Sequence, residues 1–202
     1  MKKIMFNDKY GLTQAVLEGR KTMTRRGIPQ QVVSNSKVYA QLGQRGGSIN
    51  DARIEYIVHQ SPYKIGEVVA IAQNYESILC DLSISDIIRN EISDNHSGYK
   101  NKMFVKAELM PHHIKISNIR VERLQDISDD DCLREGVRLW EDADSEYKSN
   151  PLGKLYEIVG RWDGYKSTRE AFAALIDYVS GKGTWDSNPL VWVYEFELVD
   201  SQ

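Results

Sequence analysis

The sequence contains few cysteines and no closely spaced pair of them. Only Cys80 and Cys132 occur among the 202 residues. Their separation excludes a dense disulfide scaffold and any Cys-x-x-Cys zinc or redox motif, so both are expected to be buried thiols. The four histidines also lack metal-ligand spacing, because adjacent residues such as His112 and His113 point to different faces of a strand. We expect neither a metal nor another cofactor.

Long apolar runs and an excess of charge are also absent. No stretch is long and apolar enough to cross a membrane, and the opening "MKKIMFNDKY" is too polar for a signal peptide, so we expect a cytoplasmic protein without membrane contact. The chain has 26 Lys and Arg against 29 Asp and Glu, a formal net charge of −3. Nucleic acid would therefore have to be bound by a local patch. The hydrophobic content of 41% predicts a folded chain, which we expect to form one domain over 1–202.

The chain is predicted to be rich in strands. A first strand at Lys3–Phe6 precedes a helix with apolar Leu12, Ala15 and Val16, which Gly19 ends. Further strands are predicted by alternating or β-branched segments at Arg53–His59, Glu67–Tyr75, Met103–Leu109, His113–Leu124 and Leu190–Val199. Six or so strands with short helices predict an α+β fold, a small closed or partly closed β-barrel with helices at its ends.

Two further helices are marked by their end signals. Ser128 is the expected N-cap of a short helix that ends at Gly136. Ser167 and Glu170 form a capping box at the start of a longer helix, which Gly181 closes. The longer helix carries an apolar stripe for burial against the rest of the protein.

Three segments are expected to be insertions, around 27–50, 76–102 and 137–166. The first is rich in Gln, Ser, Asn and Gly and is predicted to be a long surface loop. The second can form one helix at "LSISDIIRNEIS". The third is polar and aromatic, and an exposed patch around Trp140, Tyr147 and Trp162 would offer a partner protein a docking place.

The stretch "EGRKTMTRRGIP" concentrates positive charge around two threonines. Its four cations are Arg20, Lys21, Arg25 and Arg26. Cations near the end of a helix interact favourably with the helix dipole, which explains some of them without a function. A second structural explanation places Thr22 and Thr24 in a strand whose solvated edge carries the cations. A functional explanation comes from the wider pattern of motifs.

Four stretches follow one another along the chain: "LEGRKTMTRR", "IGEVVAIAQNY", "IRVERLQDISDDDCLREGV" and "GTWDSNPLVWVYEFELV". Together they resemble the ASCH domain family of PUA-like β-barrels, in particular its longer phage and bacterial members. One departure is that many longer members have an Arg-Glu pair where this chain has Ala72 and Gln73. Any role of the family's acid at that place is not carried over to this chain.

The resemblance implies a barrel with a basic cleft that binds RNA or a modified nucleoside. It also implies an alternative, because a bacterial branch hydrolyses N4-acetylcytidine with a lysine, a threonine and a glutamate. Their positions correspond to Lys21, Thr24 and Glu135. A lysine can deprotonate a threonine only if burial or nearby cations lower its pKa, and a glutamate can protonate the leaving amine. Because residues three apart in a regular strand point to opposite faces, Lys21 and Thr24 would need a turn or bulge to converge.

Six residues are candidates for contact with RNA or a nucleoside: Arg20, Arg25, Arg26, Tyr75, Trp185 and Asn188. The arginines can bind phosphate, the two aromatic rings can stack on an unpaired base, and the amide can bond a base edge. Packing explains the two aromatic residues better than stacking on a base does, and a turn before Pro189 explains Asn188 equally well. A third hypothesis is an interaction protein in which the barrel is only a scaffold.

Overall fold

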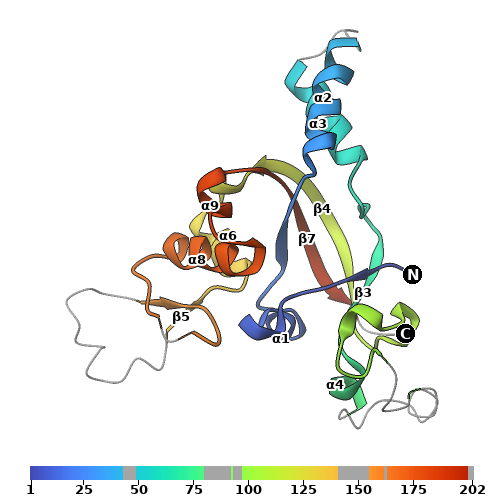
Figure 1. The fold of residues 1–202 in the computed structure, drawn as a ribbon, viewed down its shortest axis with the longest axis vertical. Helices are drawn as coiled ribbons and strands as arrows, with labels where there is room; N and C mark the ends of the chain where they lie inside the picture. Colours follow the sequence, from blue (N-terminus) through green and yellow to red (C-terminus); the bar gives the residue numbers. More distant parts are fainter. Residues whose placement is uncertain (43–48, 80–91, 93–96, 141–154, 162, 200–202) are drawn as a thin grey trace.

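The computed structural model describes residues 1–42, 49–79, 92, 97–140, 155–161 and 163–199, and its centre is one mixed β-sheet. The strands lie in the order β1 (Lys3–Ile4), β3 (Val68–Ile71), β4 (His113–Arg123), β7 (Leu190–Val199) and β2 (Met23–Gly27). Strand β1 runs parallel to β3, whereas the other neighbours are antiparallel. With helices packed around this sheet, the predicted α+β class is confirmed (Figure 1).

The two long strands β4 and β7 form the centre of the sheet. They pair along almost their whole length, with one irregularity between Ile116 and Asn118. Their bounds agree with the predicted strands to within one residue. The first half of β7 is buried from Val191 to Tyr194, because both faces of the sheet are covered there. This pair is the platform on which the other elements lie.

The sheet is not closed into a barrel in the described part of the chain. Strands β1 and β2 are its two edges and do not pair with each other. Two of the predicted strands are also wrong. Arg53–His59 lies in helix α3 (Ile49–His59), and Met103–Leu109 forms the short 3-10 helices η2 (Lys102–Phe104) and η3 (Ala107–Leu109).

Side chains from other elements bond several backbone groups around η2 and η3. The Lys3 ammonium donates to the carbonyls of Met103 and Val105, at 2.7 and 2.9 Å. The Lys106 amide donates to the Tyr75 hydroxyl at 2.8 Å. Since backbone groups must be paired when buried, these side-chain bonds replace the ladder that the alternating sequence predicted.

A helical hairpin rises from one end of the sheet. Helix α2 (Gln30–Leu42) packs against α3, so the long loop predicted for this insertion is wrong (Figure 1). The small side chains of Ser36 and Ala40 are buried four residues apart on α2, a helical spacing that a composition rich in Gln and Ser conceals. The Trp192 indole donates to the Ile57 carbonyl at 2.9 Å and joins the hairpin to β7.

Short helices flank the sheet, and several of them begin at capping residues. Asn7 caps the 3-10 helix η1 (Asp8–Tyr10), and Gly11, with φ of 62°, separates η1 from α1 (Leu12–Leu17). Ser128 and Ser167 cap α6 (Asp129–Arg134) and α8 (Thr168–Ser180) as predicted. The remaining elements are α4 (Tyr75–Leu79), η4 (Leu124–Asp126), β5 (Arg138–Leu139), β6 (Tyr156–Glu157) and α9 (Thr184–Ser187).

Several predictions for the other insertions fall outside the described residues. The helix expected at "LSISDIIRNEIS" is outside the described residues except for Ile92, which is buried. Cys80 is also outside them. In the third insertion β5 and β6 pair, but Tyr147 and Trp162 of the expected aromatic patch are not described. Cys132 is buried as predicted, and burial raises the pKa of its thiol to about 11. No helix in the described ranges is long and apolar enough to cross a membrane.

Candidate active site

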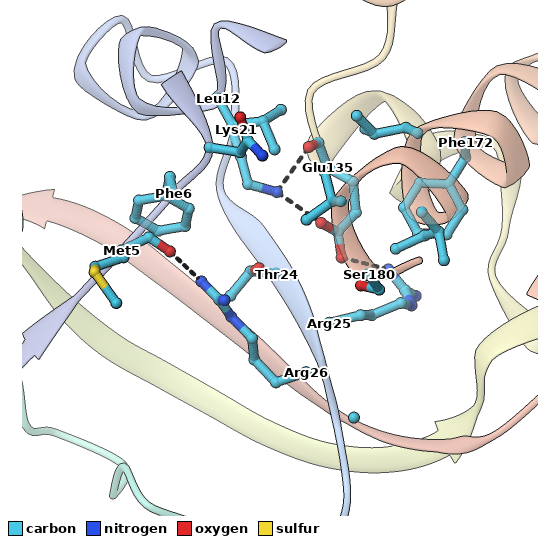
Figure 2. Close-up of a pocket in the computed structure, with 15 residues that line it drawn as sticks. Met5, Phe6, Leu12, Lys21, Thr24, Arg25, Arg26, Glu135, Phe172 and Ser180 are labelled. Carbon is cyan, nitrogen blue, oxygen red and sulfur yellow. Dashed lines mark hydrogen bonds and ion pairs between the residues drawn. The ribbon is translucent and has the colours of Figure 1, made fainter. Parts of the chain in front are cut away.

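A small pocket lies between the two edges of the sheet. Its volume is about 240 Å³, and its walls come from the segment after β1, from β2, from the end of α6 and from one face of α8 (Figure 2). One wall is polar and includes Lys21, Thr24 and Glu135. The facing wall is apolar, because α8 contributes Phe172 and the stripe that continues from it. All three predicted catalytic residues thus line one cavity.

Lys21 and Glu135 form a buried ion pair in this pocket. The Lys21 ammonium lies 2.6 Å from Glu135 Oε2 and also donates to the Glu135 backbone carbonyl at 2.7 Å. Their side chains are only 2% and 5% exposed. Burial of this kind is rare for charged groups unless they are paired and hydrogen-bonded, as they are here.

Glycines at two helix ends bring this pair together. Gly19, with φ of 72°, follows the end of α1, and the Lys21 amide then bonds the Ala15 carbonyl at 2.8 Å. Glu135 is the C-cap of α6, followed by Gly136 with φ of 111°. A Cβ at Gly136 would lie 2.9 Å from Leu12 Cδ2, which would have to shift, and the positive φ at this position disfavours any residue with a side chain.

Thr24 reaches the same pocket from strand β2. It is 5% exposed and lies opposite Tyr194 of β7 in the sheet register. Lys21 precedes the strand by two residues, so the strict alternation of a strand does not apply between them. Lys21 thus lies outside the regular strand, and both residues line the pocket.

Arg25 lies behind the pair and uses every donor it has. Its Nη1 donates to Glu135 Oε1 at 3.2 Å and to the Met23 sulfur. Its Nε and Nη2 both donate to Glu122, at 2.9 and 2.6 Å, and Nη2 also donates to Asp131 at 2.9 Å. These bonds account for all five guanidinium N–H groups. The predicted contact of Arg25 with phosphate is therefore wrong, since its side chain is buried and already bound.

More arginines and carboxylates extend this network across β4, β7 and α6. Arg120 binds Asp131 at 2.6 Å and Glu122 at 3.0 Å, and it also contacts Glu195. Arg134 binds Glu195 at 2.9 Å and donates to the Thr22 hydroxyl at 3.1 Å. Positive and negative groups alternate, so this region is not the basic surface that four cations in seven residues suggested.

The other two predicted arginines differ in their positions. Arg20 is exposed, pairs with Glu18 and does not line the pocket, so its predicted contact with RNA stays a prediction outside this cavity. Arg26 lines the pocket and is partly exposed. Its guanidinium donates to the Met5 carbonyl and lies 5.8 Å from the centre of the Phe6 ring, joining the two edges of the sheet. Arg26 stays a candidate for ligand contact.

The three remaining binding candidates do not lie in this pocket. Tyr75 is 1% exposed and packs in a second apolar core, so it is not a platform for a base. Trp185 packs edge-on against Phe172 with 6.1 Å between ring centres, while Arg169 lies over its face. Asn188 ends α9 with φ of 43° and accepts from the Gln125 amide at 2.9 Å. Packing and turn formation, the structural alternatives, explain all three.

The electrostatics of the pocket separate the roles of its two buried cations. Burial lowers the pKa of Lys21 from that of an ordinary lysine; Glu135 opposes this shift, while Arg26 and Arg25 add to it. Burial would also lower the pKa of Arg25, but Glu135, Asp131 and Glu122 outweigh it and raise that pKa. Arg25 therefore remains charged, and Lys21 is the group that can exchange a proton.

Sequence reasoning missed the carboxylates that hold Arg25 and the apolar wall of the pocket. Glu122 is close to Arg25 because β4, β7 and β2 are neighbours in the sheet, and Asp131 reaches Arg25 from helix α6. The stripe on α8 was recognised as buried, but no local signal showed what it would face. In the described residues no group of three or more His, Cys, Asp or Glu is arranged to hold a metal ion.

Comparisons with known proteins leave the site unassigned. No family model, curated protein or solved structure matches this chain. Its function is accordingly inferred from the chemistry of the pocket and from the resemblance of the sequence motifs.

Proposed function

We propose that this protein is an amidohydrolase that removes an acyl group from N4 of a modified cytidine or cytosine. The observation that carries the proposal is the buried Lys21–Glu135 pair in a small pocket that Thr24 also lines. A buried lysine with a lowered pKa can act as the base that activates a hydroxyl nucleophile, and here both groups line one pocket. The resemblance to ASCH proteins supplies the substrate class.

The reaction would proceed through an acyl-enzyme. The Thr24 hydroxyl oxygen attacks the carbonyl carbon of the amide, and the Lys21 amine accepts the hydroxyl proton. The carbon–N4 bond then breaks, and the Lys21 ammonium returns its proton to N4. Cytidine leaves, and the acyl group remains on the protein as an ester of Thr24. Water, deprotonated by the same amine, attacks the ester, so the carboxylic acid is released and the Thr24 hydroxyl is restored.

In this scheme Glu135 has a different role from that of proton donor. Both oxygens of its carboxylate already accept hydrogen bonds, Oε2 from Lys21 and Oε1 from Arg25, so its role in the scheme is to hold these two cations. Its bonds instead hold the Lys21 amine within the pocket that Thr24 also lines (Figure 2). Lys21 then both accepts and returns the proton.

The size and walls of the pocket favour a small substrate over an RNA strand. Its volume of about 240 Å³ is below the roughly 300–1,000 Å³ of typical sites for drug-sized ligands. Of the four clustered cations, only Arg26 both lines the pocket and stays partly exposed. A base with its acyl group fits a cavity that is polar on one side and apolar on the other. These features favour the hydrolase over a binding module for RNA.

The same proposal includes membership of the ASCH family and a PUA-like fold. Strands β1 and β2 are unpaired edges, yet Arg26 of β2 bonds the carbonyl of Met5, just beyond β1. Two edges that approach each other across a pocket correspond to an incompletely closed barrel. The pocket then occupies the place where closure fails.

The test is incubation of the purified protein with N4-acylated cytidines and cytosines of increasing acyl size, with products separated by chromatography. Thr24→Ala and Lys21→Met should each lower the hydrolysis rate by about 10²–10⁴-fold. The double variant should be little slower than the slower single one, because the two residues act as a unit. Thr22→Ala is the matched control, since Thr22 lies two residues away and bonds Arg134 instead of lining the pocket.

Hydrolysis that survives Thr24→Ala would contradict the proposed nucleophile. If the wild-type protein hydrolyses none of these compounds but binds the nucleosides or RNA in calorimetry, the binding-module hypothesis replaces the enzyme. Arg26→Ala should then weaken that binding, because Arg26 is the partly exposed cation of the pocket.

A further inference from the structure

The carboxylate of Glu135 is shared between two cations. Its Oε2 accepts from Lys21 at 2.6 Å and its Oε1 accepts from Arg25 at 3.2 Å. The carboxylate is 5% exposed, the Lys21 side chain 2%, and that of Arg25 is not exposed at all. All three charges are thus removed from water together.

This sharing decides whether Lys21 can give up its proton. A buried carboxylate needs a charged partner, and removing that partner is strongly unfavourable. If Lys21 were the only cation at Glu135, loss of its proton would leave the carboxylate unpaired. With Arg25 on the other oxygen, Glu135 keeps a cation whether or not Lys21 is protonated.

We propose that Arg25 is a positioning residue that acts as the permanent counter-ion of Glu135, which frees Lys21 to exchange a proton during the reaction. The inference rests on the proposed function, because it assigns a use to the Lys21 proton. Arginine suits this role, since it remains charged throughout the working pH range. Glu122 and Asp131 hold its planar group from the other side, at 2.6 and 2.9 Å.

The charged groups that face Lys21 come from two elements. Glu135 comes from the end of α6, while Arg25 and Arg26 come from β2. The other side chains that line the pocket are uncharged, and most are apolar, among them Phe6 before η1, Leu12 of α1 and Phe172 of α8. The Lys21 ammonium lies 5.9 Å from the centre of the Phe6 ring. Removal of Arg25 therefore takes away the second cation of Glu135 and a repulsive charge near Lys21.

Arg120 provides a matched control within the same network. Like Arg25, it binds Glu122 and Asp131, at 3.0 and 2.6 Å. Its third partner is Glu195, and it makes no ion pair with Glu135. Arg120→Gln therefore disturbs the shared carboxylates and leaves both cations on Glu135.

The experiment follows the Cε signals of ¹³C-labelled lysines by NMR over a pH titration, with Lys21 identified from its absence in Lys21→Met. In the wild-type protein Lys21 should titrate below the ordinary lysine value of about 10.4. Arg25→Gln should raise its midpoint by about one unit or more, and Arg120→Gln should leave it nearly unchanged. The hydrolysis rate should rise with pH up to the Lys21 midpoint, so a higher midpoint in the variant should shift this rise to higher pH. At a pH below both midpoints, the variant should be about tenfold slower than the wild type for each pH unit between the two midpoints.

The proposal would be overturned if a folded Arg25→Gln protein had the same Lys21 midpoint as the wild type, or if Arg120→Gln shifted that midpoint equally. It would also be overturned if Lys21 of the wild-type protein titrated at or above the ordinary lysine value. The last measurement needs no variant of Arg25, so it applies even if Arg25→Gln does not fold. Arg25→Lys, which keeps the charge, should preserve the midpoint better than Arg25→Gln. The titration requires no substrate, so a failure of the proposed function, seen in the hydrolysis assay, remains distinguishable.

Discussion

At the scale of single residues, Lys21 combines an unfavourable burial with a chemical opportunity. An ammonium group that is 2% exposed has lost its hydration, and its bonds to Glu135 replace only part of it. The same loss of hydration lowers its pKa and gives the amine a use as a base. Stability and reactivity therefore oppose each other at this residue.

We predict that Lys21→Met costs less stability than the break of a typical buried ion pair. Such a break costs roughly 3–5 kcal/mol because one charge is left unpaired. Here Arg25 still neutralises Glu135 in the variant, so the free energy of unfolding should fall by less than this. Urea denaturation of both proteins at pH 7 gives the difference. A larger loss would show that Arg25 does not compensate the carboxylate.

The pH dependence of this difference has a defined sign. Because burial makes the pKa of Lys21 lower in the folded protein than the ordinary lysine value of about 10.4, the unfolded chain binds more protons at pH values between the two. The stability of the wild-type protein relative to Lys21→Met should therefore increase as the pH rises toward that value. Denaturation at a mildly alkaline pH, compared with pH 7, measures this. A relative stability that falls over that range would contradict the lowered pKa.

At the scale of elements, the hairpin of α2 and α3 is joined to the sheet through a few specific contacts. The Trp192 indole donates to the Ile57 carbonyl, and the Tyr194 and Ser61 hydroxyls lie 2.8 Å apart. Both partners on the sheet side come from β7, which also pairs with β2 and so supports Thr24. The hairpin is thus bonded to the strand that also supports Thr24.

We predict that Trp192→Phe loosens the hairpin without a large effect on hydrolysis. The change removes the donor for the buried Ile57 carbonyl, which costs about 1–3 kcal/mol for an unsatisfied group. Amide hydrogen exchange should accelerate in α3, while N4-acylcytidine hydrolysis stays within a few-fold of the wild-type rate. Equal acceleration throughout β4 and β7 would instead indicate that this contact stabilises the sheet as a whole.

Elements with local signals were predictable from the sequence. Leu190–Val199 alternates over a long stretch, and α8 has both a capping box and a terminal glycine. The segment Arg53–His59 was not predictable, since its β-branched residues favour a strand until packing against α2 makes a helix more favourable. Lys106 and Tyr75 show the same limit, because the bond between them depends on the tertiary fold.

At the scale of the whole molecule, the sheet order explains the location of the pocket. The chain places β1 and β2 at opposite edges, and residues next to β1 and within β2 line the same cavity. α8 covers its apolar side and the end of α6 delivers Glu135. Residues that are more than a hundred positions apart in sequence thereby meet in one site.

The candidate site was only partly predictable for the same reason. Lys21, Thr24 and Glu135 were found through the order of motifs along the chain. In the sequence, the four cations of the stretch from Arg20 to Arg26 look like one basic patch. In the fold, however, Arg25 is enclosed by carboxylates that only the tertiary structure brings close to it. A run of charges in a sequence does not show which of them the fold will neutralise.

The central claim is that Thr24 carries the acyl group during hydrolysis, and an acid-quench experiment tests it most directly. The protein is mixed with excess N4-acylcytidine, quenched within one turnover and examined by intact mass and peptide mapping, beside Thr24→Ala and Thr22→Ala. We predict a burst of cytidine together with one acyl group on Thr24, retained in Thr22→Ala and absent in Thr24→Ala. An acyl group on another residue, or turnover by Thr24→Ala at the wild-type rate, would contradict the account.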